Sequence, residues 1–343
     1  MDADRKRILK VKDALGDRLV ILAHHYQRLE VTDLAHFKGD SFELARAAAA
    51  RPEATRIVFC GVRFMAEAAR ILAGPGQRVF MPDPYAGCPM AEMVDRREME
   101  AALARLHQVG DGKTVIPVTY MNSSAETKAF CGENGGIVCT SSNAAQTFRW
   151  AFEHGERILF VPDEFLGRNT AAAIGVPAHE VAVYNPYAPA GRLTDDEVRG
   201  AKVIVWKGYC HVHTWFTPAH VAAARGAHPG ARIVVHPECP PPVVAAADAA
   251  GSTRFIVDVV REAGPGAVVV IGTEINLVRR LARDFPDRRV LPLSTSLCPN
   301  MYKTTLPKLA AVLEGFEDEY EILLPQEIMA QARVALERML ALP

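Results

Sequence analysis

The chain has 343 residues, of which 49% are hydrophobic and 23% charged, a composition typical of a globular protein and unlike that of a disordered or fibrous one. A chain of this length is expected to fold as two or three compact units. Lys and Arg number 39 against 40 Asp and Glu, which excludes a strong overall attraction to nucleic acid or anionic membrane.

The first residues, MDADRKRILKVKDALGDR, are charged and lack the apolar core of a signal peptide. No uninterrupted apolar run is long enough to span a bilayer. A cytoplasmic location is therefore expected.

Short apolar runs rich in Val and Ile recur along the chain between helix-like stretches. Such runs are typical of buried parallel strands, and they occupy 20–23, 57–60, 79–81, 115–118, 137–139, 158–161, 203–206, 233–235, 268–271 and 290–293. The helix-like stretches include 62–73, 90–107, 144–154, 253–263 and 275–285. Alternation of the two kinds of element predicts an α/β fold.

The strand-like runs group roughly in threes, which suggests three layered units with breaks near residues 105 and 212. The Pro- and Gly-containing segment 172–199 is expected to be an insertion or long connection. A helical tail then closes the chain over 326–342. Its apolar residues share one face, which predicts docking on another unit: Ile328, Ala332, Ala335, Met339 and Leu342.

Hydroxyl residues stand where several helices should begin, in GDSFELA (39–45), NSSAETKA (122–129), TSSNAAQ (140–146) and GSTRFIVD (251–258). Ser and Thr at such positions commonly cap the helix, and for one motif alone capping is the simpler interpretation. Helix N-termini also bind anions, through free N–H groups and partial positive charge. Four such motifs together indicate a polyanionic ligand.

Histidines and an acid follow strand-like runs in ILAHHYQ (21–27), GYCHVH (208–213) and VHPEC (235–239). In a parallel α/β sheet this is the edge at which ligands bind. A single His there is more often a structural hydrogen-bonding residue than a catalyst. His236 and Glu238 flank a proline, and as a pair they are candidates for acid–base chemistry.

None of the seven cysteines falls in a CxxC pair, and an odd count argues against a complete disulfide framework. Cys60 and Cys139 lie in apolar runs and are expected in the core, whereas Cys131 and Cys239 have no such simple interpretation. Each of the other three follows a strand-like run by a short loop: Cys88, Cys210 and Cys298.

Two metal sites remain open from the residues alone. If three loops converge, three thiolates would hold a 4Fe-4S cluster and leave one iron open to act as a Lewis acid. The competing site is a zinc ion held by Cys210 with His211 or His213.

Twelve motifs, in order from residue 23 to residue 305, together resemble the quinolinate synthase family: AHHYQ, GDSFELA, FCGVRFMAEAA, PDPYAGCPMAEM, VTYMNSSAETKA, CTSSNA, FVPDEFLGRNTA, GYCHVH, HPEC, GSTRFIVD, IGTEINLV and CPNMYKTT. The resemblance implies three similar αβα units around a pseudo-threefold axis, with the active site at their junction. The expected units are 1–105 with Cys88, joined by the tail 304–343, then 106–212 with Cys210 and 213–303 with Cys298.

The resemblance also implies an activity, namely condensation of iminoaspartate with dihydroxyacetone phosphate to quinolinate, with release of phosphate and water, in de novo NAD biosynthesis. A 4Fe-4S cluster with one open iron would act as the Lewis acid. A transient contact with the enzyme that supplies iminoaspartate is implied as well.

The family's site residues are carried over motif by motif. Cluster ligands fall on Cys88, Cys210 and Cys298, and the proton-transfer groups on Tyr26, His236 and Glu238. Substrate-binding and pocket-lining positions fall on His24, Ser41, Tyr120, Asn122, Ser141, His213, Ser252, Thr253 and Met301.

Two departures from the family pattern are visible, His25 where relatives often have Tyr or Asn, and Lys207 in place of a frequent proline. Neither is a ligand position. Two alternatives to a quinolinate synthase are a non-catalytic protein that binds small anions, with incidental cysteines, and a zinc hydrolase.

Overall fold

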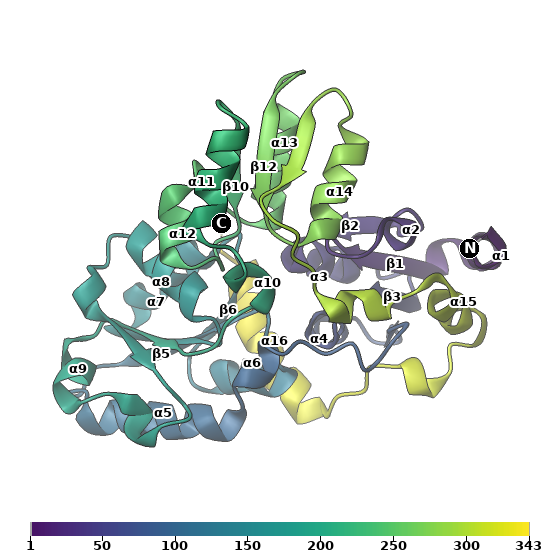
Figure 1. The fold of residues 1–343 in the computed structure, drawn as a ribbon. Helices are drawn as coiled ribbons and strands as arrows, with labels where there is room; N and C mark the ends of the chain where they lie inside the picture. Colours follow the sequence, from purple (N-terminus) through teal and green to yellow (C-terminus); the bar gives the residue numbers. More distant parts are fainter. Residues whose placement is uncertain (1, 343) are drawn as a thin grey trace.

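The computed structural model describes residues 2–342, and its helices and strands alternate along the chain as in an α/β protein (Figure 1). Three parallel sheets form the centres of three similar αβα units. The predicted fold class is therefore confirmed. The exact boundaries between the units stay a prediction.

The first unit holds a four-stranded sheet in the order β2-β1-β3-β4. All six residues of the inner strand β1 are buried, as expected for a parallel strand covered on both faces. The elements are α1 (Asp2–Leu15), η1 (Gly16–Arg18), β1 (Leu19–His24), α2 (Leu29–Thr32), β2 (Phe37–Gly39), α3 (Ser41–Ala49), β3 (Arg56–Cys60), α4 (Arg63–Leu72), β4 (Arg78–Phe80) and η2 (Ala91–Met93).

The second unit repeats this order with one strand added, as β6-β5-β7-β9-β8. The segment expected to be an insertion supplies the edge strand β8 and the short helix α9. The elements are α5 (Arg96–Val109), β5 (Val115–Tyr120), α6 (Ala125–Glu133), β6 (Ile137–Cys139), α7 (Ala144–His154), β7 (Arg157–Val161), α8 (Glu164–Ala173), η3 (Ala178–Glu180), β8 (Val181–Tyr184), η4 (Pro189–Arg192), α9 (Asp195–Gly200) and β9 (Val203–Trp206).

The third unit returns to four strands in the order β11-β10-β12-β13. In all three units the first strand lies between the second and the third, so the loops after β1, β5 and β10 occupy equivalent places. The elements are α10 (His211–Thr214), α11 (Pro218–Ala227), β10 (Arg232–Val235), α12 (Pro241–Ala246), β11 (Ala249–Ala250), α13 (Thr253–Glu262), β12 (Val268–Gly272), α14 (Ile275–Asp284), β13 (Arg289–Pro292) and η5 (Pro299–Lys303).

The tail contains α15 (Leu306–Gly315), η6 (Asp318–Tyr320) and α16 (Gln326–Leu340). Helix α15 packs against α1, while α16 packs against α6, β6 and α4 and so lies between the first two units (Figure 1). Ala332, Ala335 and Met339 are buried there, as predicted. At Gly132 a β-carbon would lie 2.0 Å from the carbonyl oxygen of Gln331, so the close approach of α6 and α16 requires glycine.

Most predicted elements agree with the structure to within one or two residues, but the helix expected over 90–107 begins later. Residues 91–93 form a separate turn, and α5 starts after Asp95. The side chain of Asp95 accepts the Glu98 N–H, and the Glu98 carboxylate accepts the Asp95 N–H. This capping box fixes the start of the helix.

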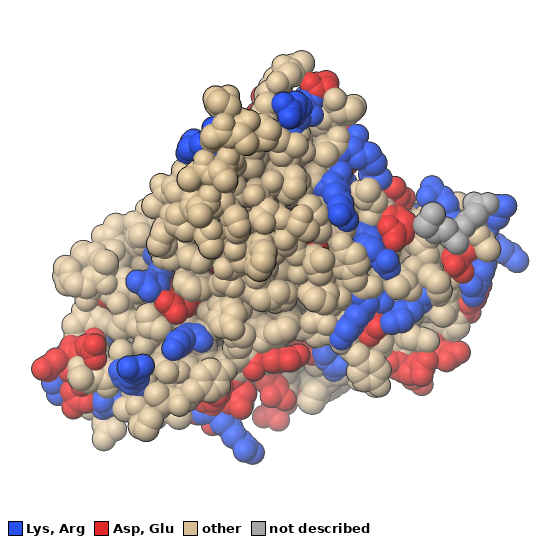
Figure 2. Space-filling model, viewed as in Figure 1, with Lys and Arg blue, Asp and Glu red and all other residues tan. Residues whose placement is uncertain are grey.

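One apolar cluster extends through all three units, and two smaller clusters complete the first and third units. Charged side chains gather on the flanks of the face shown in Figure 2, and both signs are interspersed. Among the described residues no helix is long and apolar enough to cross a membrane.

Candidate active site

A cavity at the junction of the three units brings together all the predicted site residues except Ser252. It is lined by His24, Tyr26, Ser41, Cys88, Tyr120, Asn122, Ser141, Cys210, His213, His236, Glu238, Thr253, Cys298 and Met301. These side chains come from all three units. In parallel sheets, ligand-binding loops emerge at the carboxyl ends of the strands. The convergence of distant motifs is thus found in the fold, while the chemical role of each residue stays a prediction.

One cysteine from each unit faces this cavity. Cys88, Cys210 and Cys298 are partly exposed free cysteines, whereas Cys60, Cys131, Cys139 and Cys239 are buried and do not line the cavity. Burial, then the carboxylate of Glu238 and the other two thiols, raises the pKa of the Cys210 thiol well above its usual value. Ionisation of these three thiols would therefore require a compensating cation at the cavity.

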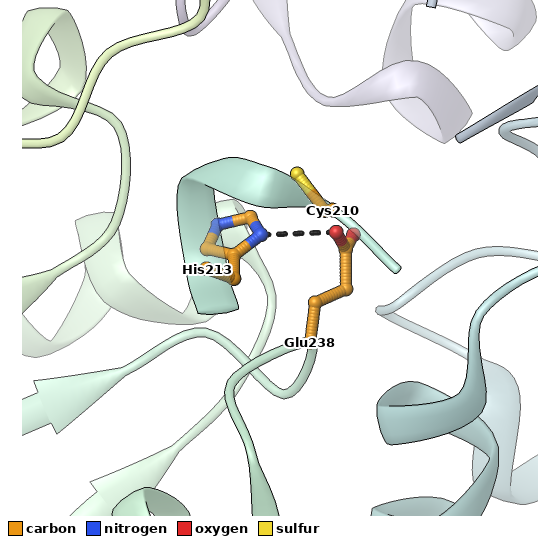
Figure 3. A group of neighbouring side chains, drawn as sticks. All are labelled: Cys210, His213 and Glu238. Carbon is orange, nitrogen blue, oxygen red and sulfur yellow. Dashed lines mark hydrogen bonds and ion pairs between the residues drawn. The ribbon is translucent and has the colours of Figure 1, made fainter. Parts of the chain in front are cut away.

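Two of the three predicted acid–base residues, Tyr26 and Glu238, are joined in one hydrogen-bonded chain, whereas the His236 ring accepts the backbone N–H of Glu238. Tyr26 Oη and Thr273 Oγ1 lie 2.7 Å apart, and Thr273 Oγ1 lies 3.1 Å from His213 Nε2. His213 Nδ1 is 2.9 Å from Glu238 Oε2, with the two side chains pointing toward one another beside Cys210 (Figure 3). The Tyr120 hydroxyl donates to the other Glu238 oxygen at 2.6 Å.

The protonation states along this hydrogen-bonded chain follow from burial and from the neighbouring charged and hydrogen-bonding groups. Burial opposes ionisation of Glu238, but His213, His236 and the hydrogen bonds from His213 and Tyr120 outweigh it and lower the pKa of the carboxyl. Burial and the charge of Glu238 raise the pKa of both Tyr26 and Tyr120 well above the usual value. At neutral pH the site thus presents an ionised carboxylate between two protonated phenols.

Two histidines of the cavity are neutral. Burial, with a smaller contribution from the Arg280 guanidinium, lowers the pKa of His24 to about 3. Burial, followed by the charge of His213, lowers the pKa of His236 to about 3. The rings of His213 and His236 stack with their centroids 4.3 Å apart. A neutral imidazole offers one N–H hydrogen-bond donor and one ring-nitrogen acceptor.

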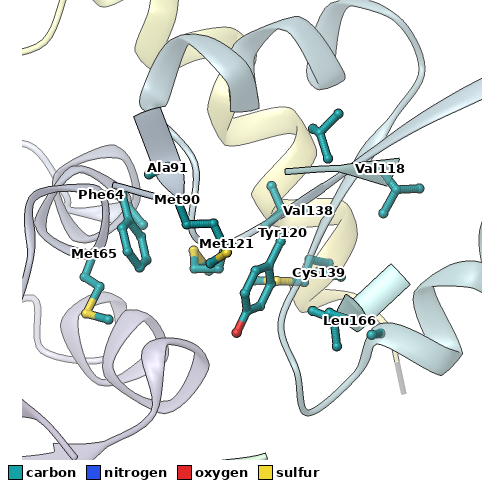
Figure 4. Close-up of a cluster of buried hydrophobic side chains, with 14 of the residues drawn as sticks. Phe64, Met65, Met90, Ala91, Val118, Tyr120, Met121, Val138, Cys139 and Leu166 are labelled. Carbon is teal, nitrogen blue, oxygen red and sulfur yellow. The ribbon is translucent and has the colours of Figure 1, made fainter. Parts of the chain in front are cut away.

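Tyr120 belongs to the apolar wall of the cavity. Its ring packs in a cluster with Phe64, Met65, Met90 and Met121, and its hydroxyl points away from the cluster (Figure 4). Packing of this kind fixes the ring and leaves the hydroxyl as the reactive end.

The hydroxyl motifs divide into caps and cavity residues. Ser124 and Ser252 cap α6 and α13, because their hydroxyls accept the Thr127 and Phe255 N–H groups. The Ser252 hydroxyl therefore acts as a helix cap, while the next residue, Thr253, lines the cavity. Ser41 and Ser141 also line the cavity.

Asp40 caps α3 and was not predicted. Its carboxylate accepts the Glu43 N–H and the Ser142 hydroxyl, which leaves Ser41 free to face the cavity. No Lys or Arg lines the cavity among the described residues. Anionic ligands must therefore be held by hydroxyl, amide and backbone N–H groups.

Further site residues escaped the sequence analysis although they lie in quoted motifs. Thr273 links Tyr26 to His213, and Glu274 is buried beside Cys298, whose N–H it accepts. Burial raises the pKa of Glu274 to about 8. Asn276 donates to the Tyr26 carbonyl. The motif IGTEINLV marked this segment, but only the fold brings it against Tyr26 and Cys298.

The competing metal site is also visible in the geometry. One ligand atom each from Cys210, His213 and Glu238 lies within 4.8 Å of the others, while His211 is exposed. However, both ring nitrogens of His213 already have partners, Nδ1 with Glu238 and Nε2 with Thr273. A metal at this place would have to displace at least one of them.

Three similar α/β units that each contribute a cysteine to one central cavity, beside His213 and Glu238, define a multi-unit α/β protein whose site is compatible with metal binding. The family model described as "Quinolinate synthetase A protein" matches residues 6–341. The chain is 49% identical to the quinolinate synthase of Corynebacterium glutamicum, with 99% of this chain and 88% of the relative covered. The chain therefore belongs to the quinolinate synthase family.

Two further relatives have nearly the same sequence identity to this chain over nearly its whole length. The quinolinate synthase of Nocardioides sp. is 48% identical, with 98% of this chain and 89% of the relative covered. The quinolinate synthase of Streptomyces coelicolor is 48% identical, with 98% of this chain and 88% of the relative covered.

Proposed function

We propose that this chain is a quinolinate synthase that condenses iminoaspartate with dihydroxyacetone phosphate and releases phosphate and water, as a step of de novo NAD biosynthesis. The observation that carries the proposal is the single cavity in which three cysteines, two phenols, three histidines and two carboxylates meet. Membership of the family supports the same activity.

The cysteines fit a 4Fe-4S cluster with three protein ligands. Cys88, Cys210 and Cys298 would hold it, one from each unit, and the described part of the chain offers no fourth cysteine at the cavity. When bound, such a cluster would supply a Lewis-acidic iron for the dehydrations. It would also balance the charge of the three thiolates where no Lys or Arg is present.

Glu238 is the proposed general base, because its carboxyl is held ionised and lies at the cavity. The hydroxyls of Tyr26 and Tyr120 stay protonated and can donate hydrogen bonds to substrate oxygen, and Tyr26 is the proposed proton-transfer group of the two. His236 stacks on His213 and is kept neutral with Nδ1 accepting the Glu238 N–H, so in proton transfer it would hold the substrate through its other ring nitrogen rather than act as the base.

The anionic groups of both substrates would be held by hydroxyl, amide and imidazole groups of the cavity. Ser41 and Ser141 present hydroxyls, of which that of Ser141 also bonds Tyr120, Asn122 presents an amide, and Thr253 is the first residue of α13. His24, which is neutral, can donate a further hydrogen bond without titrating. Helix N-termini and hydroxyl groups stabilise phosphate and carboxylate without a cationic side chain.

The test is an assay with protein purified without oxygen. Iminoaspartate generated in the reaction and dihydroxyacetone phosphate are supplied, and quinolinate is measured together with iron, sulfide and zinc. Quinolinate formation by brown protein that contains iron and sulfide supports the proposal. Colourless protein that contains zinc and forms no quinolinate would instead favour a zinc site at Cys210, His213 and Glu238.

A further inference from the structure

Each unit directs a polar side chain into its neighbour from an equivalent helix, and in the third unit Arg280 on the same helix adds a contact with His25 Nδ1. The helices α4, α8 and α14 each follow the third strand of their unit, β3, β7 and β12. They carry Glu67, Asn169 and Asn276. Glu67 and Asn276 are buried and Asn169 is half-buried.

Glu67 of the first unit contacts the second. Its Oε2 accepts the N–H of Ala125 at 3.0 Å, at the first residue of α6. The segment just before Ala125 follows β5 and carries Asn122, which lines the cavity. The buried Lys128 ammonium donates to the carbonyls of Met121 and Ser123 in the same segment.

Asn169 of the second unit contacts the third. Its Nδ2 donates to the carbonyl of Pro237 at 2.8 Å and to that of Cys239 at 2.9 Å. An amide nitrogen has two hydrogens, so one Asn can satisfy both carbonyls. The two carbonyls lie on either side of Glu238, in the segment that follows β10. The carboxylate is thus fixed through its own backbone.

Asn276 of the third unit contacts the first. Its Nδ2 donates to the Tyr26 carbonyl at 3.1 Å, and its Oδ1 accepts from the Tyr302 hydroxyl at 3.2 Å. Tyr26 lies in the segment that follows β1. The contacts therefore run in a cycle, from the first unit to the second, the second to the third, and the third back to the first.

We propose that Glu67, Asn169 and Asn276 are equivalent positioning residues, each fixing the segment after the first strand of the next unit. Those segments carry Asn122, Glu238 and Tyr26, so their positions relative to one another depend on the docking of all three units. Only the expected effect on turnover rests on the proposed function. The hydrogen bonds and their effect on the loops are independent of it.

Such contacts matter because these segments lie outside regular strands, and loops are the most mobile parts of a fold. A site tolerates errors of only about 0.5 Å in the placement of its reacting groups. A misplacement of about 1 Å can cost on the order of 100-fold in rate. The inter-unit bonds therefore act on turnover through Glu238 and Tyr26 without touching the substrate.

The first test replaces Asn169 by Asp, which keeps the shape and removes both donors. Arg168→Ala on the same helix is the control, because Arg168 is exposed and pairs only with Glu164. We expect Asn169→Asp to lower kcat by about 10- to 100-fold, with KM changed by less than about threefold. Iron content should match the control, and kcat is taken per folded molecule, because the lost hydrogen bonds also lower the midpoint of unfolding.

The second test measures backbone hydrogen exchange without substrates. Each substitution should speed exchange in a segment of the next unit. The expected segments are 236–240 for Asn169→Asp, 121–125 for Glu67→Leu and 25–28 for Asn276→Leu. Glu67→Gln keeps an acceptor for the Ala125 N–H and should restore protection. Should Asn169→Asp fail to fold, Asn169→Leu replaces it with a neutral side chain of similar size.

Unchanged kcat and unchanged exchange in 236–240 would overturn the proposal. Two other results would also overturn the proposal and indicate a purely structural contact. One is faster exchange throughout the unit that carries the substitution. The other is a loss of stability with normal kcat per folded molecule. If the wild type forms no quinolinate but the exchange pattern is as expected, only the proposed function fails.

Discussion

Replacement of Thr273 by Val tests the hydrogen-bonded chain across the cavity. Thr273 is fully buried, and its hydroxyl lies 2.7 Å from Tyr26 Oη and 3.1 Å from His213 Nε2. Valine has nearly the same shape, so no cavity forms and the change removes only the hydroxyl. Two buried polar groups then lose their shared partner.

The size of the effect follows from those two bonds. Each hydrogen bond contributes about 1 kcal/mol, and an unsatisfied buried group costs about 1–3 kcal/mol. Tyr26 Oη also lies 3.3 Å from His213 Nε2, so the two can partly restore a direct bond. We therefore expect a loss of about 1–2 kcal/mol in the free energy of unfolding and a fall in turnover of about tenfold.

The assay is urea unfolding of the metal-free protein, combined with turnover of the anaerobic enzyme. Thr147→Val is the matched control, because Thr147 is fully buried and its hydroxyl has no hydrogen-bond partner. That change should be neutral or stabilising. If Thr273→Val and Thr147→Val gave the same unfolding free energy and the same turnover, the chain from Tyr26 to Glu238 would have no energetic importance.

Two further outcomes are expected. Glu238→Gln should lower turnover by about two to four orders of magnitude with unchanged iron content, and near-normal turnover would rule out Glu238 as the base. Because the pKa of His24 in the folded chain is about 3, the unfolded chain binds more protons between about pH 6.5 and pH 3, and stability falls as the pH falls through this window. Between pH 6.5 and 4.5 the loss should be about 2–3 kcal/mol for His24, and His24→Gln should show a shallower fall in urea unfolding.

The strands and most helices could be predicted because parallel strands covered on both faces read as continuous apolar runs. The run 158–161, for example, lies within β7, whose five residues are all buried. Short edge strands such as β2 and β11 could not be predicted, because three or two residues that are not all buried form neither an apolar run nor a periodic pattern. The start of α5 was missed because the capping box at Asp95 was not considered.

The site could be predicted only through motifs and not from spacing. Cys88, Cys210 and Cys298 are separated by more than eighty residues each, and nothing local indicates that they meet. Thr273, Asn169 and Asn276 were missed for a related reason. Their partners lie in other units, so the signal that identifies them is a contact that exists only after the units have docked.

The central claim is that three cysteines from three units hold one cluster. The most direct measurement is iron and sulfide per chain in anaerobically purified single serine variants of all seven cysteines. The account predicts that Cys88→Ser, Cys210→Ser and Cys298→Ser each lose the cluster, whereas variants at Cys60, Cys131, Cys139 and Cys239 keep it. Cluster retention in Cys298→Ser, or its loss in Cys239→Ser with the fold intact, would contradict the account.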